Sequence, residues 1–313
     1  MKKLILVLTI FLLLASSNLS ENQKFLLFLE TEWKYELSQN PVYATAMGVK
    51  GYETKWKDNS LKGIEQRKTH NQNTLKKVNR FDPSKLSKTN NLNLRLFIQL
   101  LENKIKISEY NRHLLPFSHR GGIQLTHEDT ETLPLKTLED YSFWIERLNN
   151  LDKRINQIIV LAELGLKEGY KAPKILMDRV YRQITIQGKN DVQKHPFYQI
   201  FKNLPDSISK EDQSWLRLEA KKTIKEIVIP SYQLLKKYFK EKYLPQSRNT
   251  VGLYDIPNGK ELYIDLAKSF TTTELSPEEI HQIGLKEVAR IRKEMGEVIK
   301  ELGFKGSFQE FLV

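Results

Sequence analysis

The chain has 313 residues and no cysteine, which excludes disulfides, thiolate metal ligands and attachment of a lipid to a cysteine. Lysine and arginine number 50 against 38 aspartate and glutamate, giving a formal net charge of +12, yet the basic residues are spread along the chain and mixed with acidic ones. This mixing favours a solvated surface or, as an alternative, attraction to an anionic cell envelope; with no nucleic-acid-binding motif present, no nucleic-acid partner is expected.

The first seventeen residues have the pattern of a secretory signal peptide. Lys2 and Lys3 precede an unbroken apolar run from Leu4 to Leu14, and small residues follow at 15–17. The run is too short to span a bilayer, so no transmembrane segment is expected. We predict a signal peptide at 1–17, export to the periplasm or the extracellular space, and a mature chain at 18–313 that is the helical N-terminal portion of an incomplete domain.

Helical spacing of apolar residues predicts three helices in the first third of the mature chain. The first covers Phe25 to Leu37 and ends at Asn40-Pro41, a weaker one covers 61–78, and the third runs from Leu94 to Ile105. Residues 43–59 form a loop whose aromatic side chains either line a cleft or, more commonly, pack beneath the loop.

A second loop is expected at 114–134, where helical spacing disappears and Pro116 and Gly121-Gly122 occur. The longest periodic run follows at 137–169, and Asn149-Asn150 either kinks it or divides it in two. Pro173 opens the next helix.

Ser209 caps a further helix whose apolar residues stay in phase across Pro230. One kinked, continuous helix explains this phase better than two separate helices, and Pro245 ends it. Residues 251–264 contain the hairpin signal Asn258-Gly259, but the spacing of the apolar residues that follow favours a short helix.

The C-terminal segment carries the strongest helix signals in the chain. Ser276-Pro277-Glu278-Glu279 is a capping box with proline at the first helical position, and an apolar stripe then continues to Leu302 before Gly303. A second capping box at 307–310 is followed by less than two turns of chain, so we predict that the domain is cut short. The expected fold is an all-α, multi-helix array of long amphipathic helices, C-terminally truncated, with at most a minor hairpin near 251–264.

The order of several short motifs resembles the bacterial domain-of-unknown-function family 885. The motifs include 252–259, Tyr263, 275–285, 287–291 and 303–307, with upstream matches at Asp140-Tyr141, Arg147-Leu148, Gly165 to Gly169, Pro173 and 230–232. Members of that family are about twice as long and resemble zinc metallopeptidases, with a His-Glu-x-x-His helix in the second half. The resemblance implies that zinc is held in a C-terminal half outside this chain.

No catalytic or metal-ligating set is expected within the chain itself. A zinc site of this kind needs two histidines one helical turn apart, and no two of the six histidines are separated by four residues. The segment closest to a His-Glu-x-x-His motif is 127–131, in which Glu131 occupies the position of the second histidine. Helical periodicity is lacking there, so a solvated loop is expected. His281 is expected on a helix surface.

Tyr254, Gly259 and Tyr263 are the candidate substrate-binding residues, because the resemblance implies substrate contact around Gly259 and Tyr263. A glycine that permits close backbone approach, with aromatic rings beside it, suits an extended peptide. The alternative is a turn glycine with two core tyrosines.

Two functions remain open. In the first, the chain is the N-terminal helical portion of a secreted, zinc-peptidase-like hydrolase, inactive alone, whose partners are a peptide substrate and the C-terminal half if that half is separately encoded. In the second, it is a self-standing helical binding protein of the cell envelope.

Overall fold

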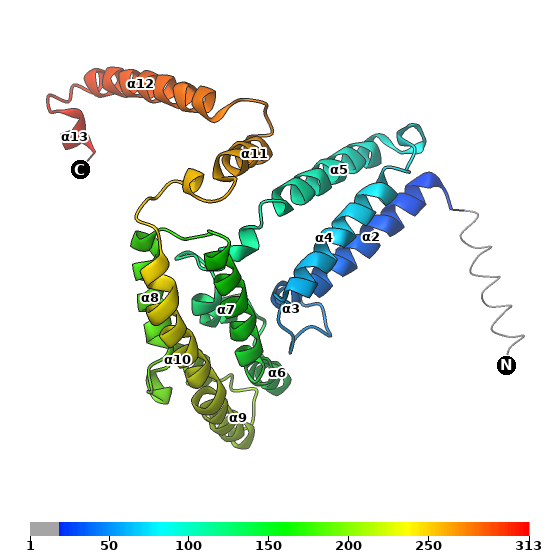
Figure 1. Cartoon of the computed structure of the whole chain (residues 1–313), viewed down its shortest axis with the longest axis vertical. Helices are drawn as coiled ribbons and strands as arrows, with labels where there is room; N and C mark the ends of the chain where they lie inside the picture. Colours follow the sequence, from blue (N-terminus) through cyan, green and yellow to red (C-terminus); the bar gives the residue numbers. More distant parts are fainter. Residues whose placement is uncertain (1–18, 313) are drawn as a thin grey trace, which may run out of the picture. The chain divides into compact units, whose positions relative to one another are not determined.

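The computed structural model describes residues 19–312, which fold as helices joined by short connections (Figure 1). The predicted signal peptide at 1–17 lies outside the described residues. Within 19–312 there is no β-strand, only two isolated bridges, Ser118 with Gly121 and Pro173 with Arg248, so the all-α prediction is confirmed. No helix in this part of the chain is long and apolar enough to cross a membrane.

The chain divides into two compact units, unit 1 ending at Gly252 and unit 2 beginning at Leu253. The helices of unit 1 are α2 (Glu21–Gln39), α3 (Pro41–Ala46), α4 (Leu61–Val78), α5 (Lys88–Ser108), α6 (Leu138–Leu148), α7 (Leu151–Lys167), α8 (Lys174–Gln187), α9 (Lys210–Thr223) and α10 (Ile229–Tyr238). Unit 2 holds α11 (Gly259–Thr271), α12 (Pro277–Glu301) and the single turn α13 (Phe308–Phe311).

The first helices of unit 1 build a small core of their own. Ser20, Ser60 and Ser87 cap α2, α4 and α5, each accepting a hydrogen bond from a backbone amide of the first turn. Helices α4 and α5 pack along one another, and this core contains the buried side chains Phe25, Val78, Leu94 and Leu101 (Figure 1). The three predicted helices are confirmed.

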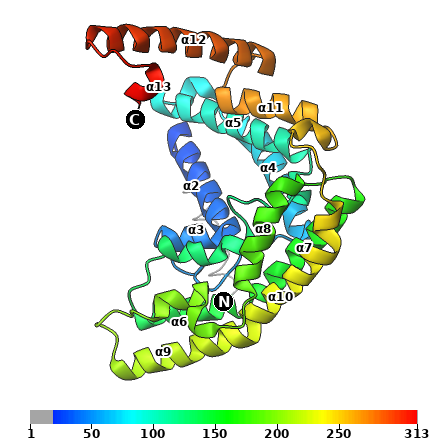
Figure 2. The same cartoon turned by 90° about the vertical axis from the view of Figure 1, so that its left-hand side faces the viewer.

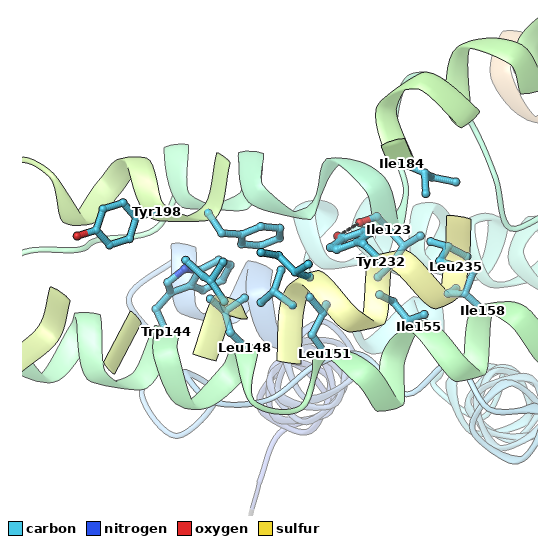
Figure 3. Packing of buried hydrophobic residues seen from close by; sticks show 14 of the residues in the cluster. Ile123, Trp144, Leu148, Leu151, Ile155, Ile158, Ile184, Tyr198, Tyr232 and Leu235 are labelled. Atoms are coloured by element: carbon cyan, nitrogen blue, oxygen red, sulfur yellow. Dashed lines mark hydrogen bonds between the residues drawn. The ribbon is translucent and has the colours of Figure 1, made fainter. Parts of the chain in front are cut away.

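The main core lies among α6, α7, α8, α9 and α10. Trp144 and Leu148 from α6, and Ile155 from α7, meet Tyr232 of α10 in a continuous apolar layer (Figure 3). The hydroxyl of Tyr232 is buried and donates to the Ile123 carbonyl, shown as the dashed line in Figure 3. This bond satisfies the one polar group that Tyr232 carries into the core.

Helices α9 and α10 are joined by a π-helical turn, η6 (Ile224–Val228), and follow one another without a break (Figure 2). The Ile229 amide, just before Pro230, donates to the Ile224 carbonyl five residues back. A second π turn, η7 (Phe239–Tyr243), stands just before Pro245 in the same way. The prediction of a continuous helix across Pro230 is confirmed, and the π turns supply the room that each proline ring needs.

Gly165 in α7 allows the backbone around Leu114 to pack directly on that helix. A side-chain carbon added at Gly165 would lie 2.1 Å from the carbonyl oxygen of Leu114, which belongs to the 3-10 turn η2 (Arg112–Leu114). No residue other than glycine fits so close an approach.

Two stretches predicted as loops are partly helical. Residues 41–46 form α3, opened by Pro41, and the segment 114–134 contains the 3-10 helix η3 (Ile123–Glu131). The sequence did not predict η3, because its buried side chains Ile123, Gln124 and Thr126 do not follow α-helical spacing. The run at 137–169 is divided at Asn149-Asn150 into α6 and α7, one of the two predicted outcomes.

Unit 2 begins with the 3-10 turn η9 (Leu253–Asp255), after which α11 starts at Gly259. The helix favoured for this stretch is therefore confirmed, and the hairpin does not form. Helix α12 has the predicted capping box at Ser276, and Gly303 follows it with a φ of 70°, the left-handed conformation expected of a helix end.

Candidate functional site

Tyr254 and Tyr263, two of the predicted substrate-binding residues, lie together in unit 2. Their rings meet edge to face with centroids 5.5 Å apart, and both side chains are about half exposed. Tyr254 comes from η9 and Tyr263 from the second turn of α11. The pair forms an exposed aromatic surface of the kind that can flank an extended peptide.

Gly259, the third predicted residue, is buried at the start of α11. A side-chain carbon there would lie 2.0 Å from the carbonyl oxygen of Leu253, so the glycine allows close approach of the chain's own backbone. It fixes η9 against α11 and thereby brings the two tyrosines together. Its role toward a peptide would be indirect, through the position of Tyr254.

Three of the histidines have hydrogen-bond contacts with other side chains or the backbone. His70 Nε2 lies 2.6 Å from a carboxylate oxygen of Glu32, while His127 and His195 both contact Gln187. His127 belongs to η3 and is half-buried, so the expectation of a solvated loop at 127–131 is wrong for this residue.

No group of three or more histidine, cysteine, aspartate or glutamate residues within 19–312 is arranged to hold a metal ion. The residues present in this part of the chain therefore do not fit the zinc that the family resemblance implies, and no chemical step is assigned to zinc.

A cavity of about 470 Å³ opens in unit 1 between the loop that follows α3 and the end of η3. It is lined by Asn40, Pro41, Val42, Tyr43, Ala46, Trp56, Lys57, Asp129, Thr132 and Arg154. The volume lies within the range of about 300–1,000 Å³ typical of small-molecule sites. The lining is mainly apolar, with a few charged groups among the aromatic rings.

Arg147 lies behind the Trp56 wall of this cavity and is fully buried. Its Nη2 donates to the Thr45 hydroxyl at 2.7 Å and to the Tyr52 carbonyl at 2.8 Å, while Nε and Nη1 have no hydrogen-bond partner. Burial lowers the pKa of Arg147 to about 10, so the guanidinium stays charged at neutral pH.

Arg154 forms part of the cavity wall itself. Its guanidinium carbon lies 4.4 Å from the centroid of the Trp56 ring, a cation–π contact. Nη1 donates to the Thr126 hydroxyl at 3.3 Å, whereas the buried Nε has no partner. Thr126 in turn donates to the Ile123 carbonyl, so a polar chain runs from the cavity to the core bond of Tyr232.

Asp129 is the one carboxylate that lines the cavity. Burial raises the pKa of Asp129 above its usual value, and the nearby positive charges of Arg154 and Arg147 oppose that rise. Neither guanidinium makes an ion pair with a carboxylate among the described residues. The lining holds two cationic groups, Arg154 and Lys57, against the one acid Asp129, so it can accommodate a further negative charge. Glu53 and Glu36, the other acids near Arg147 and Lys57, do not line the cavity.

The sequence alone did not point to Arg154 or Lys57, and Asp129 was considered only as part of the segment 127–131. For the aromatic loop at 43–59, the lining of a cleft was one of the two alternatives. The spacing of residues in α6 and α7 does indicate that two arginines are buried. Arg147 and Arg154 stand seven residues apart, each three residues after a buried apolar side chain, Trp144 and Leu151. This spacing places both arginines near the buried face of the run.

Comparisons with known proteins agree with this fold. The family model described as "Bacterial protein of unknown function (DUF885)" matches residues 41–313. A solved structure described as "the putative lipoprotein from Colwellia psychrerythraea" is similar, with a TM-score of 0.75 and 19% sequence identity. The match covers 92% of this chain and 52% of that one, so this chain spans about half the length of its structural neighbour. At this identity the likeness shows the fold alone. A comparison with curated proteins gives no match.

Proposed function

The chain belongs to the bacterial DUF885 family, and on that basis we propose that it is the N-terminal helical portion of a larger exported hydrolase of the zinc-peptidase-like kind. The observation that carries the proposal is the apolar stripe of α12, which unit 2 itself leaves uncovered. Val288, Ile291 and Val298 lie at helical spacing on α12 and are about half exposed. A long amphipathic helix of this kind normally buries its apolar face against a partner.

The remaining portion of the larger protein is the proposed partner of that stripe. The match covers 52% of the structural neighbour, so about half of that chain lies outside it, which supports a second portion of comparable size. In this arrangement the catalytic residues and the zinc belong to that portion, and this chain alone is inactive. Tyr254 and Tyr263 would contact an extended peptide substrate, and the segment 1–17 would direct export.

A self-standing binding protein of the cell envelope is the second candidate function. The cavity beside Trp56 and Arg154 favours it, because a preformed site of that volume binds small molecules without any catalytic half.

The coding DNA beyond the codon for Val313 separates the two candidates. We expect a continuing or neighbouring reading frame that encodes a His-Glu-x-x-His helix. A stop codon followed by unrelated sequence would favour the binding protein. Mass spectrometry of the exported product tests the leader independently, since retention of Met1 would contradict cleavage of 1–17.

The proposed peptide contact is tested by truncating the two tyrosines. With the complete protein, Tyr254→Ala and Tyr263→Ala should raise KM for peptide hydrolysis. Glu261→Ala should not, because Glu261 is exposed two residues before Tyr263 and so lies on another side of α11. Gly259→Ala is unsuitable as a probe, because it would displace the Leu253 carbonyl and perturb the fold.

A further inference from the structure

We propose that the cavity in unit 1 binds an organic carboxylate. Arg154 and Lys57 would pair with the carboxylate group, and the rings of Trp56 and Tyr43 would contact its apolar part. The site is separate from the exposed pair Tyr254 and Tyr263, and the inference holds for either candidate function because it depends only on the residues that line the cavity.

The guanidinium of Arg154 has unused hydrogen-bonding capacity. A guanidinium offers five N–H donors in a fixed planar fork. The one hydrogen bond that Arg154 makes among the described residues runs from Nη1 to Thr126, and its position over the Trp56 ring fixes the side chain in the cavity wall. A carboxylate is the group whose two oxygens match such a fork.

The charges around the cavity also favour an anion. The ammonium group of Lys57 donates to the Asn40 side chain at 3.1 Å and retains two further donors. Arg147 adds a third positive charge, with its guanidinium carbon 5.5 Å from the centroid of Trp56. Asp129 is the single acid in the lining. A bound carboxylate would therefore reduce an excess of positive charge.

The apolar part of the lining favours an organic acid over a bare inorganic anion. Pro41, Val42 and Ala46 face the same space as the two aromatic rings. A volume of about 470 Å³ accommodates a ring or a short peptide segment beside the charged group. The carboxylate can belong to a free acid or to the end or side chain of a peptide.

The test compares an acid with its uncharged amide, using the full chain and isothermal titration calorimetry at low salt. The probes are 3-phenylpropionate and 3-phenylpropionamide, which share size and shape and differ in charge. We expect the acid to bind at least about ten-fold more tightly, the effect of one charge-assisted hydrogen bond. N-acetyl-Ala-Ala-Phe with a free or an amidated C-terminus forms the second arm and distinguishes a peptide carboxylate from a free acid.

Variants then assign the effect to the cavity. Arg154→Gln should remove the preference for the acid, and Lys57→Gln should weaken it several-fold. Asp129→Asn should strengthen binding of the acid, because it removes the one negative charge from the lining. Arg95→Gln is the matched control, since Arg95 is exposed on α5 and away from the cavity lining.

The inference is overturned if acid and amide bind equally in both arms, or if neither acid binds. It is overturned as well if the acid binds but neither Lys57→Gln nor Asp129→Asn changes its affinity. These two variants keep the test decisive even where Arg154→Gln fails to fold, because Lys57 is exposed and asparagine has nearly the shape of aspartate.

Discussion

The guanidinium of Arg154 lies over the ring of Trp56, with its central carbon 4.4 Å from the ring centroid. The same indole donates from Nε1 to the Arg147 carbonyl at 2.8 Å. One aromatic side chain from the loop after α3 therefore fastens that loop to both α6 and α7. Because the contacts are partly desolvated, they stabilise the fold more than a surface cation–π pair would.

Trp56→Phe should destabilise unit 1 measurably. The substitution removes the hydrogen bond to Arg147 and weakens the π face under Arg154, so we expect the free energy of unfolding to fall by about 1–3 kcal/mol. Urea unfolding followed by circular dichroism measures it. Trp215→Phe on α9 is the control, because Trp215 is 47% exposed; equal losses for the two variants would contradict the assigned role of Trp56.

Asp129→Asn should change the dependence of stability on pH. The pKa of Asp129 is raised in the folded state by burial, so its contribution to stability is present below the unfolded pKa of about 3.9 and is lost as pH rises through the folded pKa. The variant does not suffer this loss. Its melting temperature relative to the parent should therefore increase between about pH 4 and pH 7.

Asp206→Asn provides the matched control for this pH series, because the Asp206 side chain is fully exposed. Its melting temperature should track that of the parent throughout. A difference between Asp129→Asn and the parent that stays constant with pH, or shrinks as pH rises, would contradict the raised pKa of Asp129.

Much of the fold follows from apolar spacing and caps. The bounds of α4 and the start of α12 at Ser276 were predictable because side-chain spacing and a capping residue agree there. The π turns were not predicted, although a signal exists. From Leu216 to Tyr232 the buried residues recur every four residues, and each such step overshoots an α-helical turn by about 40°. The wider π-helical turn at η6 keeps these buried residues on one face of the helix.

The cavity was harder to predict than the helices. Its residues come from α2–α3, the loop at 56–57, η3 and α7, and the sequence alone does not bring these segments together. Arginine is usually a surface residue, so the sequence alone suggests that Arg147 and Arg154 are solvated, despite their spacing. The tyrosine pair was easier, because Tyr254 and Tyr263 are close in sequence and Gly259 lies between them.

Tyr232→Phe isolates one buried hydrogen bond in the main core. The Ile123 carbonyl keeps the Thr126 hydroxyl as a second donor, so the variant should leave no unsatisfied acceptor. We expect a loss of about 0.5–1.5 kcal/mol in the free energy of unfolding, the usual net value of one such bond. Tyr232→Leu removes the ring as well and should cost more; an equal effect of the two substitutions would show that the hydroxyl carries the whole contribution.

Gly165→Ala should be among the most damaging single-carbon changes in unit 1. The added methyl group would meet the Leu114 carbonyl oxygen at 2.1 Å, and neither the helix nor η2 can yield without moving backbone. We expect a loss of several kcal/mol, seen as a large fall in melting temperature. Gly188→Ala is the control, because its nearest neighbours lie at 3.7 Å. A similar fall for both glycines would contradict the close approach.

The last prediction concerns the apolar stripe of α12. If a further portion of the protein normally covers Val288, Ile291 and Val298, the 313-residue chain alone exposes an apolar patch above the ~300–600 Å² usual for the largest patch of a monomer. The chain should then bind a hydrophobic dye and self-associate, because burial of that surface is favourable.

Val288→Gln with Ile291→Gln should reduce both effects while keeping α12 helical, since glutamine has at least the helix propensity of the residues it replaces. Arg292→Gln with Lys286→Gln, also exposed on α12, should leave both unchanged. Dye fluorescence and sedimentation velocity measure the outcome. A monomer that binds no dye and melts in one sharp transition would mean that the stripe needs no partner. The larger-hydrolase proposal would then give way to the self-standing binding protein, because the observation that supports it would have lost its physical basis.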